Sequence, residues 1–142
     1  MPIDYAALLA RADDVAARAY APYSKFQVGA ALLAEDGETV FVGCNVENVS
    51  YGLTNCAERT AIYSAVAAGV RRFKAIAIVQ GGAGGGAAGA AEPCWPCGAC
   101  RQVLAEFGPD MEVVFREGAG QRVTVLRELL PHCFDAARLQ VR

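Results

Sequence analysis

The stretch EPCWPCGACRQ, residues 92–102, contains three cysteines spaced three residues apart: Cys94, Cys97 and Cys100. Thiolates in a C-x-x-C pair bind zinc because a turn brings both sulfurs within about 2.3 Å of one ion. Two such pairs are possible here, Cys94 with Cys97 or Cys97 with Cys100. We favour the second pair because the residues after Cys97 have the apolar spacing of a helix that begins there, over residues 98–107. Either pair supplies only two ligands, and tetrahedral zinc needs more.

A third sulfur is available in TNCAERTA, residues 54–61, where Cys56 is predicted to begin another helix over residues 56–68. If both helices begin at one ion, their positive N-terminal ends favour thiolates over thiols. Three protein ligands leave a fourth position open, which is typical of a catalytic zinc site. Glu58, in the first turn, can stand beside the ion without binding it, because helix side chains lean toward the N-terminus. A base beside a metal-activated water predicts a hydrolytic site.

The bulk composition excludes several classes of protein. The chain has 142 residues, of which 54% are hydrophobic and 20% charged, and its formal charge of −2 offers no overall basic field for nucleic acid. We expect one domain over residues 1–142. The start, MPIDYAALLARADD, lacks the pattern of a signal peptide, and no run approaches the roughly 20 apolar residues of a membrane span. These features predict a cytoplasmic protein in which the six cysteines are reduced.

The order of apolar patterns predicts an α/β fold of three layers, α/β/α, in which helices cover both faces of a five-stranded mixed sheet. A helix capped by Asp4 should run to about Tyr20. A hairpin at Asp36-Gly37 should join the first two strands. The Gly/Ala-rich segment 81–93 is expected to be a flexible loop. The other predicted elements are strands at 26–33, 39–42, 75–79, 111–115 and 122–125, helices at 56–68 and 98–107, and a short helical piece at 126–130.

Cys-Ala-Glu at 56–58, followed by Pro-Cys-Gly-Ala-Cys at 96–100, resembles the zinc-dependent cytidine deaminases of the small homotetrameric type. The likeness covers nearly the whole chain. Its motifs together are highly specific for this family, although any one of them alone would not be. It implies a cytidine deaminase-like version of the predicted fold. The matching motifs are YAPYSKFQVGAAL (20–32), GCNVENVSYG (43–52), CAERTA (56–61), PCGACRQVL (96–104) and ELLPHCF (128–134).

The resemblance implies a metal centre and a proton carrier. Cys56, Cys97 and Cys100 would hold one zinc ion per chain. Glu58 would take a proton from the zinc water and later hand protons to the ring nitrogen and the departing amine. Arg59 is placed to donate to a ligand sulfur and so offset the negative charge of three thiolates. Alternatively, Arg59 would be an ordinary solvent-exposed residue of the helix.

The same resemblance assigns the residues that bind the substrate. Asn45 and Glu47 would bind the ribose hydroxyls, and the backbone N–H of Ala57 would meet the base carbonyl. Phe26 and Phe134 would bracket the pyrimidine, with Phe134 arriving from a neighbouring subunit of a homotetramer. Without the resemblance, the two polar side chains would be interpreted as turn caps, and the two phenylalanines as a core residue and an interface anchor.

The implied function is hydrolytic deamination of cytidine and 2′-deoxycytidine to the uridines, with release of ammonia, in pyrimidine salvage. Glu47 would repel a phosphate on the sugar, so we expect a free nucleoside and neither nucleic acid nor membrane as partner. One alternative is a deaminase of a related aminopyrimidine nucleoside such as blasticidin S; another is an editing deaminase. A closed structural zinc module would need Cys94 as a fourth ligand. A thioredoxin-like redox role lacks its expected sequence context.

Overall fold

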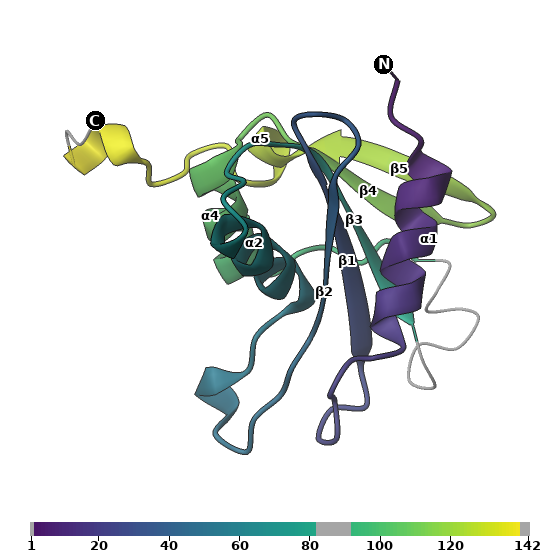
Figure 1. Cartoon of the computed structure of the whole chain (residues 1–142). Helices are drawn as coiled ribbons and strands as arrows, with labels where there is room; N and C mark the ends of the chain where they lie inside the picture. Colours follow the sequence, from purple (N-terminus) through teal and green to yellow (C-terminus); the bar gives the residue numbers. More distant parts are fainter. Residues whose placement is uncertain (1, 82–91, 140–142) are drawn as a thin grey trace.

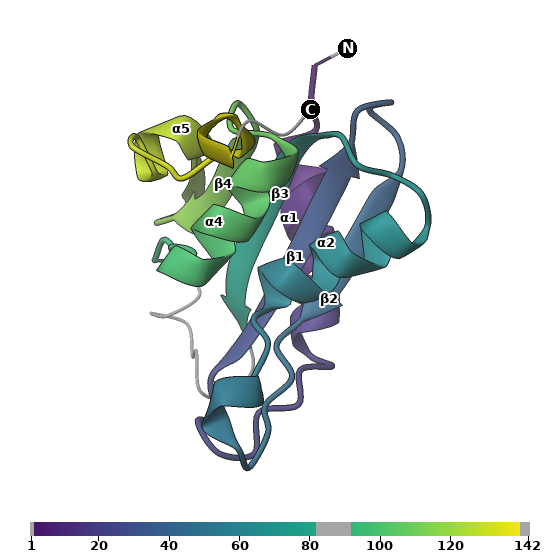
Figure 2. The same cartoon turned by 90° about the vertical axis from the view of Figure 1, so that its left-hand side faces the viewer.

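The computed structural model describes residues 2–81 and 92–139, and these form three layers (Figures 1 and 2). A five-stranded sheet in the order β2-β1-β3-β4-β5 lies in the middle. Helix α1 covers one face, and helices α2 and α4 lie side by side on the other. The predicted three-layer fold with a mixed sheet is therefore confirmed. Most of the loop expected at 81–93 lies outside the described residues.

The sheet is built around strands that are buried on both faces. The apolar run AIAIV lies in β3, which pairs in parallel with β4 and antiparallel with β1; the other strand pairs are antiparallel. In the β1–β2 hairpin the carboxylate of Asp36 accepts from the backbone N–H of Glu38 and Thr39. All five strands were predicted to within two residues. They are β1 Gln27–Ala34, β2 Val40–Cys44, β3 Phe73–Gly81, β4 Glu112–Glu117 and β5 Gly120–Val125.

The helices begin where local capping groups place them. Asp4 accepts from the backbone N–H of Ala7 at 3.0 Å and caps α1, while cysteines stand at the N-caps of α2 and α4. No helix within 2–81 or 92–139 is both long and apolar enough to cross a membrane. The α-helices are α1 Tyr5–Ala16, α2 Ala57–Ala67, α4 Gly98–Phe107 and α5 Leu126–Leu129, and the 3-10 helices are η1 Tyr51–Leu53 and η2 Ala136–Leu139.

Helix α1 ends at Ala16, so the prediction that it runs to Tyr20 was wrong at this end. The cause is a pairing with the segment that follows β2. Tyr20 donates its N–H to the carbonyl of Asn45 at 3.0 Å and accepts from the N–H of Glu47 at 2.9 Å. These two bonds hold residue 20 in an extended conformation, which brings the segment after α1 against the segment after β2 at one end of the sheet (Figures 1 and 2).

Two glycines let the helices approach the sheet more closely than a side chain would allow. A Cβ on Gly29 of β1 would lie 2.0 Å from the carbonyl oxygen of Ala12 in α1. A Cβ on Gly43 of β2 would lie 2.5 Å from the carbonyl oxygen of Ala57 and 2.4 Å from the N of Ala61, both in α2. Because Ala57 is the first residue of α2, Gly43 fixes the height above the sheet at which that helix begins.

Gly43→Ala should therefore destabilise the protein, because α2 must move to make room for the added methyl group. We expect the free energy of unfolding to fall by about 1–3 kcal/mol, as for other overpacked sites. Urea unfolding followed by circular dichroism measures the change. The control is Gly52→Ala, whose Cβ would meet nothing within 4 Å; equal stability of the two variants would contradict the prediction.

Candidate active site

Helices α2 and α4 begin close together at one end of the sheet, and their N-caps, Cys56 and Cys97, bring two sulfurs together (Figures 1 and 2). Cys100, in the first turn of α4, adds a third. The Cys56 and Cys97 sulfurs are 3.7 Å apart, the Cys97 and Cys100 sulfurs 3.4 Å, and all three lie within 4.8 Å of one another. Bonds of about 2.3 Å to one tetrahedral ion place sulfurs about 3.8 Å apart. The cluster therefore fits a single zinc ion, as expected from the sequence.

Two of the three sulfurs accept hydrogen bonds from nitrogen donors. The backbone N–H of Cys100 points at the Cys97 sulfur, and Arg59 donates from Nη2 to the Cys56 sulfur at 3.3 Å. The Cys100 thiol and then Arg59 lower the pKa of Cys56 to about 5 by hydrogen bonding. The hydrogen bond to Cys56 and burial raise the pKa of Cys100. Without a cation the negative charge is therefore favoured on Cys56 over Cys100, and metal binding would release the Cys100 proton.

Glu58 lies in the first turn of α2 and is 4% exposed. Burial, with a further contribution from the charge of Cys56, raises the pKa of its carboxyl to about 7. A carboxyl with a pKa near neutrality can both accept and return a proton at physiological pH. The position expected from the sequence, beside the sulfurs but not one of the three ligands, is the one that the structure gives it.

A cavity of about 560 Å³ opens beside the sulfurs and Glu58. This volume is in the range of small-molecule sites. Four of the five residues that we expected to bind the substrate line it, and so do Cys94 and Trp95, which we had not assigned to the substrate. Cys94 stands apart from the sulfur cluster, and burial raises the pKa of its thiol to about 12, so it stays neutral. The four expected residues are Phe26, Asn45, Glu47 and Ala57.

Asn45 serves the fold as well as the cavity wall. Its Oδ1 accepts from the N–H of Val28 at 2.8 Å, and its Nδ2 donates to the carbonyl of Phe26 at 2.7 Å. The side chain is 8% exposed. One N–H and one lone pair of the amide remain for a ligand. The interpretation of Asn45 as a structural polar residue is therefore supported by the geometry, and a binding role is compatible with it.

Glu47 is held at the rim of the cavity by the turn before β1. Its Oε1 accepts from the N–H of Tyr23 at 3.0 Å and of Ser24 at 3.1 Å, and its Oε2 accepts from the Ser24 hydroxyl. The Ser24 hydroxyl, followed by these backbone donors, lowers the pKa of Glu47. The carboxylate is therefore ionised and fixed in place. Ser24 was not predicted as a site residue, although it stands two residues before Phe26 in the motif YAPYSKFQVGAAL.

Phe134 lies outside the cavity of its own chain. It is 60% exposed and belongs to the C-terminal segment, which extends away from the body of the molecule (Figure 1). Its carbonyl accepts from Nε2 of Gln102 in α4 at 2.7 Å. The expectation that Phe134 arrives at a site from a neighbouring subunit stays a prediction, because only one chain is described.

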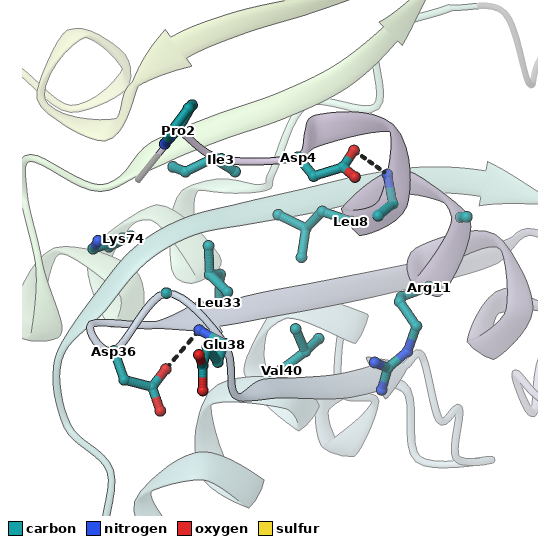
Figure 3. A pocket seen from close by; sticks show the side chains of 13 residues that line it. Pro2, Ile3, Asp4, Leu8, Arg11, Leu33, Asp36, Glu38, Val40 and Lys74 are labelled. Atoms are coloured by element: carbon teal, nitrogen blue, oxygen red, sulfur yellow. Dashed lines mark hydrogen bonds between the residues drawn. The ribbon is translucent and has the colours of Figure 1, made fainter.

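A second cavity, of about 520 Å³, lies between α1 and the β1–β2 hairpin (Figure 3). Leu8, Leu33 and Val40 lie along it, with Lys74 and Arg11 on opposite sides of the view. None of its described lining residues is a cysteine or a histidine. The sulfur cluster and the buried carboxyl of Glu58 lie at the first cavity and not at this one.

Comparisons with known proteins agree with this chemistry. The family described as "Cytidine and deoxycytidylate deaminase zinc-binding region" matches residues 3–117. Cytidine deaminase from Sporosarcina psychrophila is 49% identical, over 94% of this chain and 93% of that protein. A crystal structure of cytidine deaminase from Burkholderia pseudomallei has a TM-score of 0.81 and 51% identity, and the match covers 93% of this chain and 100% of that one. Blasticidin-S deaminase from Bacillus cereus is 31% identical, over 76% of each protein.

Two single substitutions test which cysteines bind zinc. Cys100→Ser should lose the metal, because a serine hydroxyl is a poor substitute for one of three thiolates. Cys94→Ser should keep a full complement, because the Cys94 thiol stands apart from the cluster. Metal content after dialysis, measured by mass spectrometry, separates the two. The opposite pattern would move the ligand pair to Cys94 and Cys97.

Glu58→Gln should stabilise the metal-free protein above neutral pH. The raised pKa means that the folded state binds the Glu58 proton more tightly than the unfolded chain does. The buried Glu58 carboxyl therefore costs no stability below pH 4.5, which is the ordinary pKa of a glutamate. The cost grows as the pH rises and is complete above about pH 7. It should reach at most about 3 kcal/mol. Urea unfolding with a chelator, at about pH 4 and about pH 8, measures it; a difference independent of pH would contradict the burial of this carboxyl.

Proposed function

The chain belongs to the cytidine deaminase family and acts as a cytidine deaminase, and we propose that it converts cytidine and 2′-deoxycytidine to the corresponding uridines by hydrolysis, with release of ammonia. One observation carries the proposal: a buried carboxyl, Glu58, lies beside three convergent sulfurs in a cavity of suitable size. The residue roles below rest on that geometry and on the family.

Cys56, Cys97 and Cys100 would hold the zinc ion, which when bound would lower the pKa of water from about 15.7 to about 7. Glu58 would accept a proton from the attacking water and deliver it to N3 of the ring as the water oxygen adds to C4. The remaining hydroxyl proton then passes through Glu58 to the amino group. The C4–N bond breaks, ammonia leaves, and C4 becomes a carbonyl. A carboxyl with a pKa near neutrality suits both directions of transfer.

The other lining residues hold the nucleoside. Ala57 is the first residue of α2, so its N–H has no acceptor within the helix and is free for the base carbonyl. Phe26, which is 42% exposed, offers its ring to the pyrimidine. The remaining amide N–H of Asn45 and the carboxylate of Glu47 bind the ribose hydroxyls. Because Glu47 is ionised, a phosphate on the sugar is repelled, and the substrate is a nucleoside.

We also assign the enzyme to a homotetramer in which Phe134 covers the pocket of a neighbouring subunit. Three apolar side chains between β2 and α2 support an interface, since Val49, Tyr51 and Leu53 are each at least 70% exposed. The six cysteines are unpaired, which supports the cytoplasm as its location. Residues 1–142 then form one catalytic domain that serves pyrimidine salvage.

A second candidate is a deaminase of blasticidin S, favoured by the 31% identity to the enzyme from Bacillus cereus. The sequence NVEN at 45–48 favours cytidine, because two of its residues, Asn45 and Glu47, line the cavity where we propose that the ribose binds. Turnover of both compounds by the purified protein, followed in parallel, decides between them. Turnover of blasticidin S alone would replace the proposal.

Glu58→Gln should lose at least about a hundredfold in kcat, because an amide cannot carry protons between water and ring. The fall in ultraviolet absorbance of cytidine measures turnover, and metal analysis shows that zinc is retained. Glu106→Gln is the control, because Glu106 is an exposed glutamate of α4 outside the cavity. Retained activity in Glu58→Gln would remove the proposed proton carrier.

A further inference from the structure

The turn before β1 connects two walls of the cavity through a single hydroxyl group. The Ser24 hydroxyl donates to Oε2 of Glu47 and accepts from the backbone N–H of Phe26 at 3.0 Å. The backbone N–H of Ser24 donates to the other carboxylate oxygen of Glu47 at 3.1 Å. Ser24 itself lines the cavity. It is therefore bonded at once to the carboxylate at the sugar end and to the backbone of the aromatic side chain.

The residue after Ser24 adopts a conformation that L-amino acids disfavour. Lys25 has a φ of 62°, and among the described residues it is the only non-glycine residue with a positive φ. Such a conformation persists where the surrounding structure determines it, and it is found disproportionately at functional sites. At Lys25 it turns the chain so that Ser24 faces Glu47 while the next residue, Phe26, leads into β1.

We propose that Ser24 is a positioning residue for the deaminase reaction: it holds Glu47 ready for the sugar hydroxyls and fixes the Phe26 backbone beside the base. This inference rests on the proposed function. A purely structural role explains the geometry less well. The bonds between Ser24 and Glu47 lie at the exposed rim, where contacts of charged groups contribute little to folding. The disfavoured backbone at Lys25 opposes folding.

The expected effect follows from what Glu47 does when the hydroxyl is removed. Its carboxylate keeps two backbone donors but loses the bond to Oε2, so it can rotate and must be ordered again when the sugar binds. Ordering one side chain, together with the loss of a charge-assisted bond, corresponds to about tenfold in affinity. The loss should appear in KM, because Ser24 touches neither the metal ligands nor Glu58.

The test compares Ser24→Ala and Ser24→Thr with the wild-type enzyme, using cytidine and 2′,3′-dideoxycytidine. Ser24→Ala should raise KM for cytidine about tenfold with kcat within about twofold, and Ser24→Thr, which keeps a hydroxyl, should restore it. The rise should be much smaller for the dideoxynucleoside, which has no sugar hydroxyl at 2′ or 3′ for Glu47 to accept from. In the double variant Ser24→Ala/Glu47→Ala, the fold-increase in KM should be smaller than the product of the fold-increases in the two single variants.

A second pair of variants leaves the serine intact. Lys25→Gly should keep the wild-type KM, because glycine adopts a positive φ freely, while Lys25→Val should raise KM as Ser24→Ala does. An equal rise for both nucleosides, or effects of Ser24→Ala and Glu47→Ala that multiply fully, would overturn the inference. If wild-type protein left cytidine unchanged, the proposed function would fail as well. If the wild-type enzyme converted cytidine and Ser24→Ala had the same KM as the wild type, only this inference would fail.

Discussion

Three sulfurs within 4.8 Å of one another would repel as thiolates, and several features at this end of the molecule reduce that repulsion. Two helices begin at the cluster, so their positive ends face it. Arg59 adds a full positive charge at 3.3 Å from one sulfur. A divalent cation bound by the three cysteines would supply the remaining positive charge. The helices can begin this close together because α2 lies against Gly43 of the sheet without an intervening side chain.

The same cavity holds two carboxyl groups in opposite environments. Burial raises the pKa of Glu58 to about 7, whereas hydrogen bonds from Ser24 and two backbone donors lower the pKa of Glu47 at the rim. One group is thereby suited to moving protons and the other to remaining charged. Separate environments for two carboxyls are a general way for an enzyme to assign them different tasks. Here the difference follows from position: Glu58 is buried in the first turn of α2, and Glu47 is in a loop at the rim.

The sequence was informative wherever the cause of a structure is local. Helix starts at Asp4 and Cys97 were predicted correctly because capping groups act within a few residues. The end of α1 was not predicted correctly, because it depends on hydrogen bonds between Tyr20 and residues 45–47, which are far apart in the chain. The role of Ser24 was not predicted for the same reason, because a serine in a turn has no special significance until its distant partner, Glu47, is known. The proposed placement of Phe134 at a neighbouring pocket involves a second copy of the chain, which a single sequence does not describe.

The close approach of α2 to β2 also determines where this protein can be redesigned. A laboratory seeking a new nucleoside drug as substrate has little freedom at the sheet, because any side chain at Gly43 would push Ala57, and with it the catalytic helix, off its position. The loops at the rim of the cavity are different, since the rim residues Ser24 and Glu47 are not among the three cysteines that could bind the metal. Libraries should therefore vary the rim and leave the glycine untouched, so that altered selectivity does not come with a lost metal.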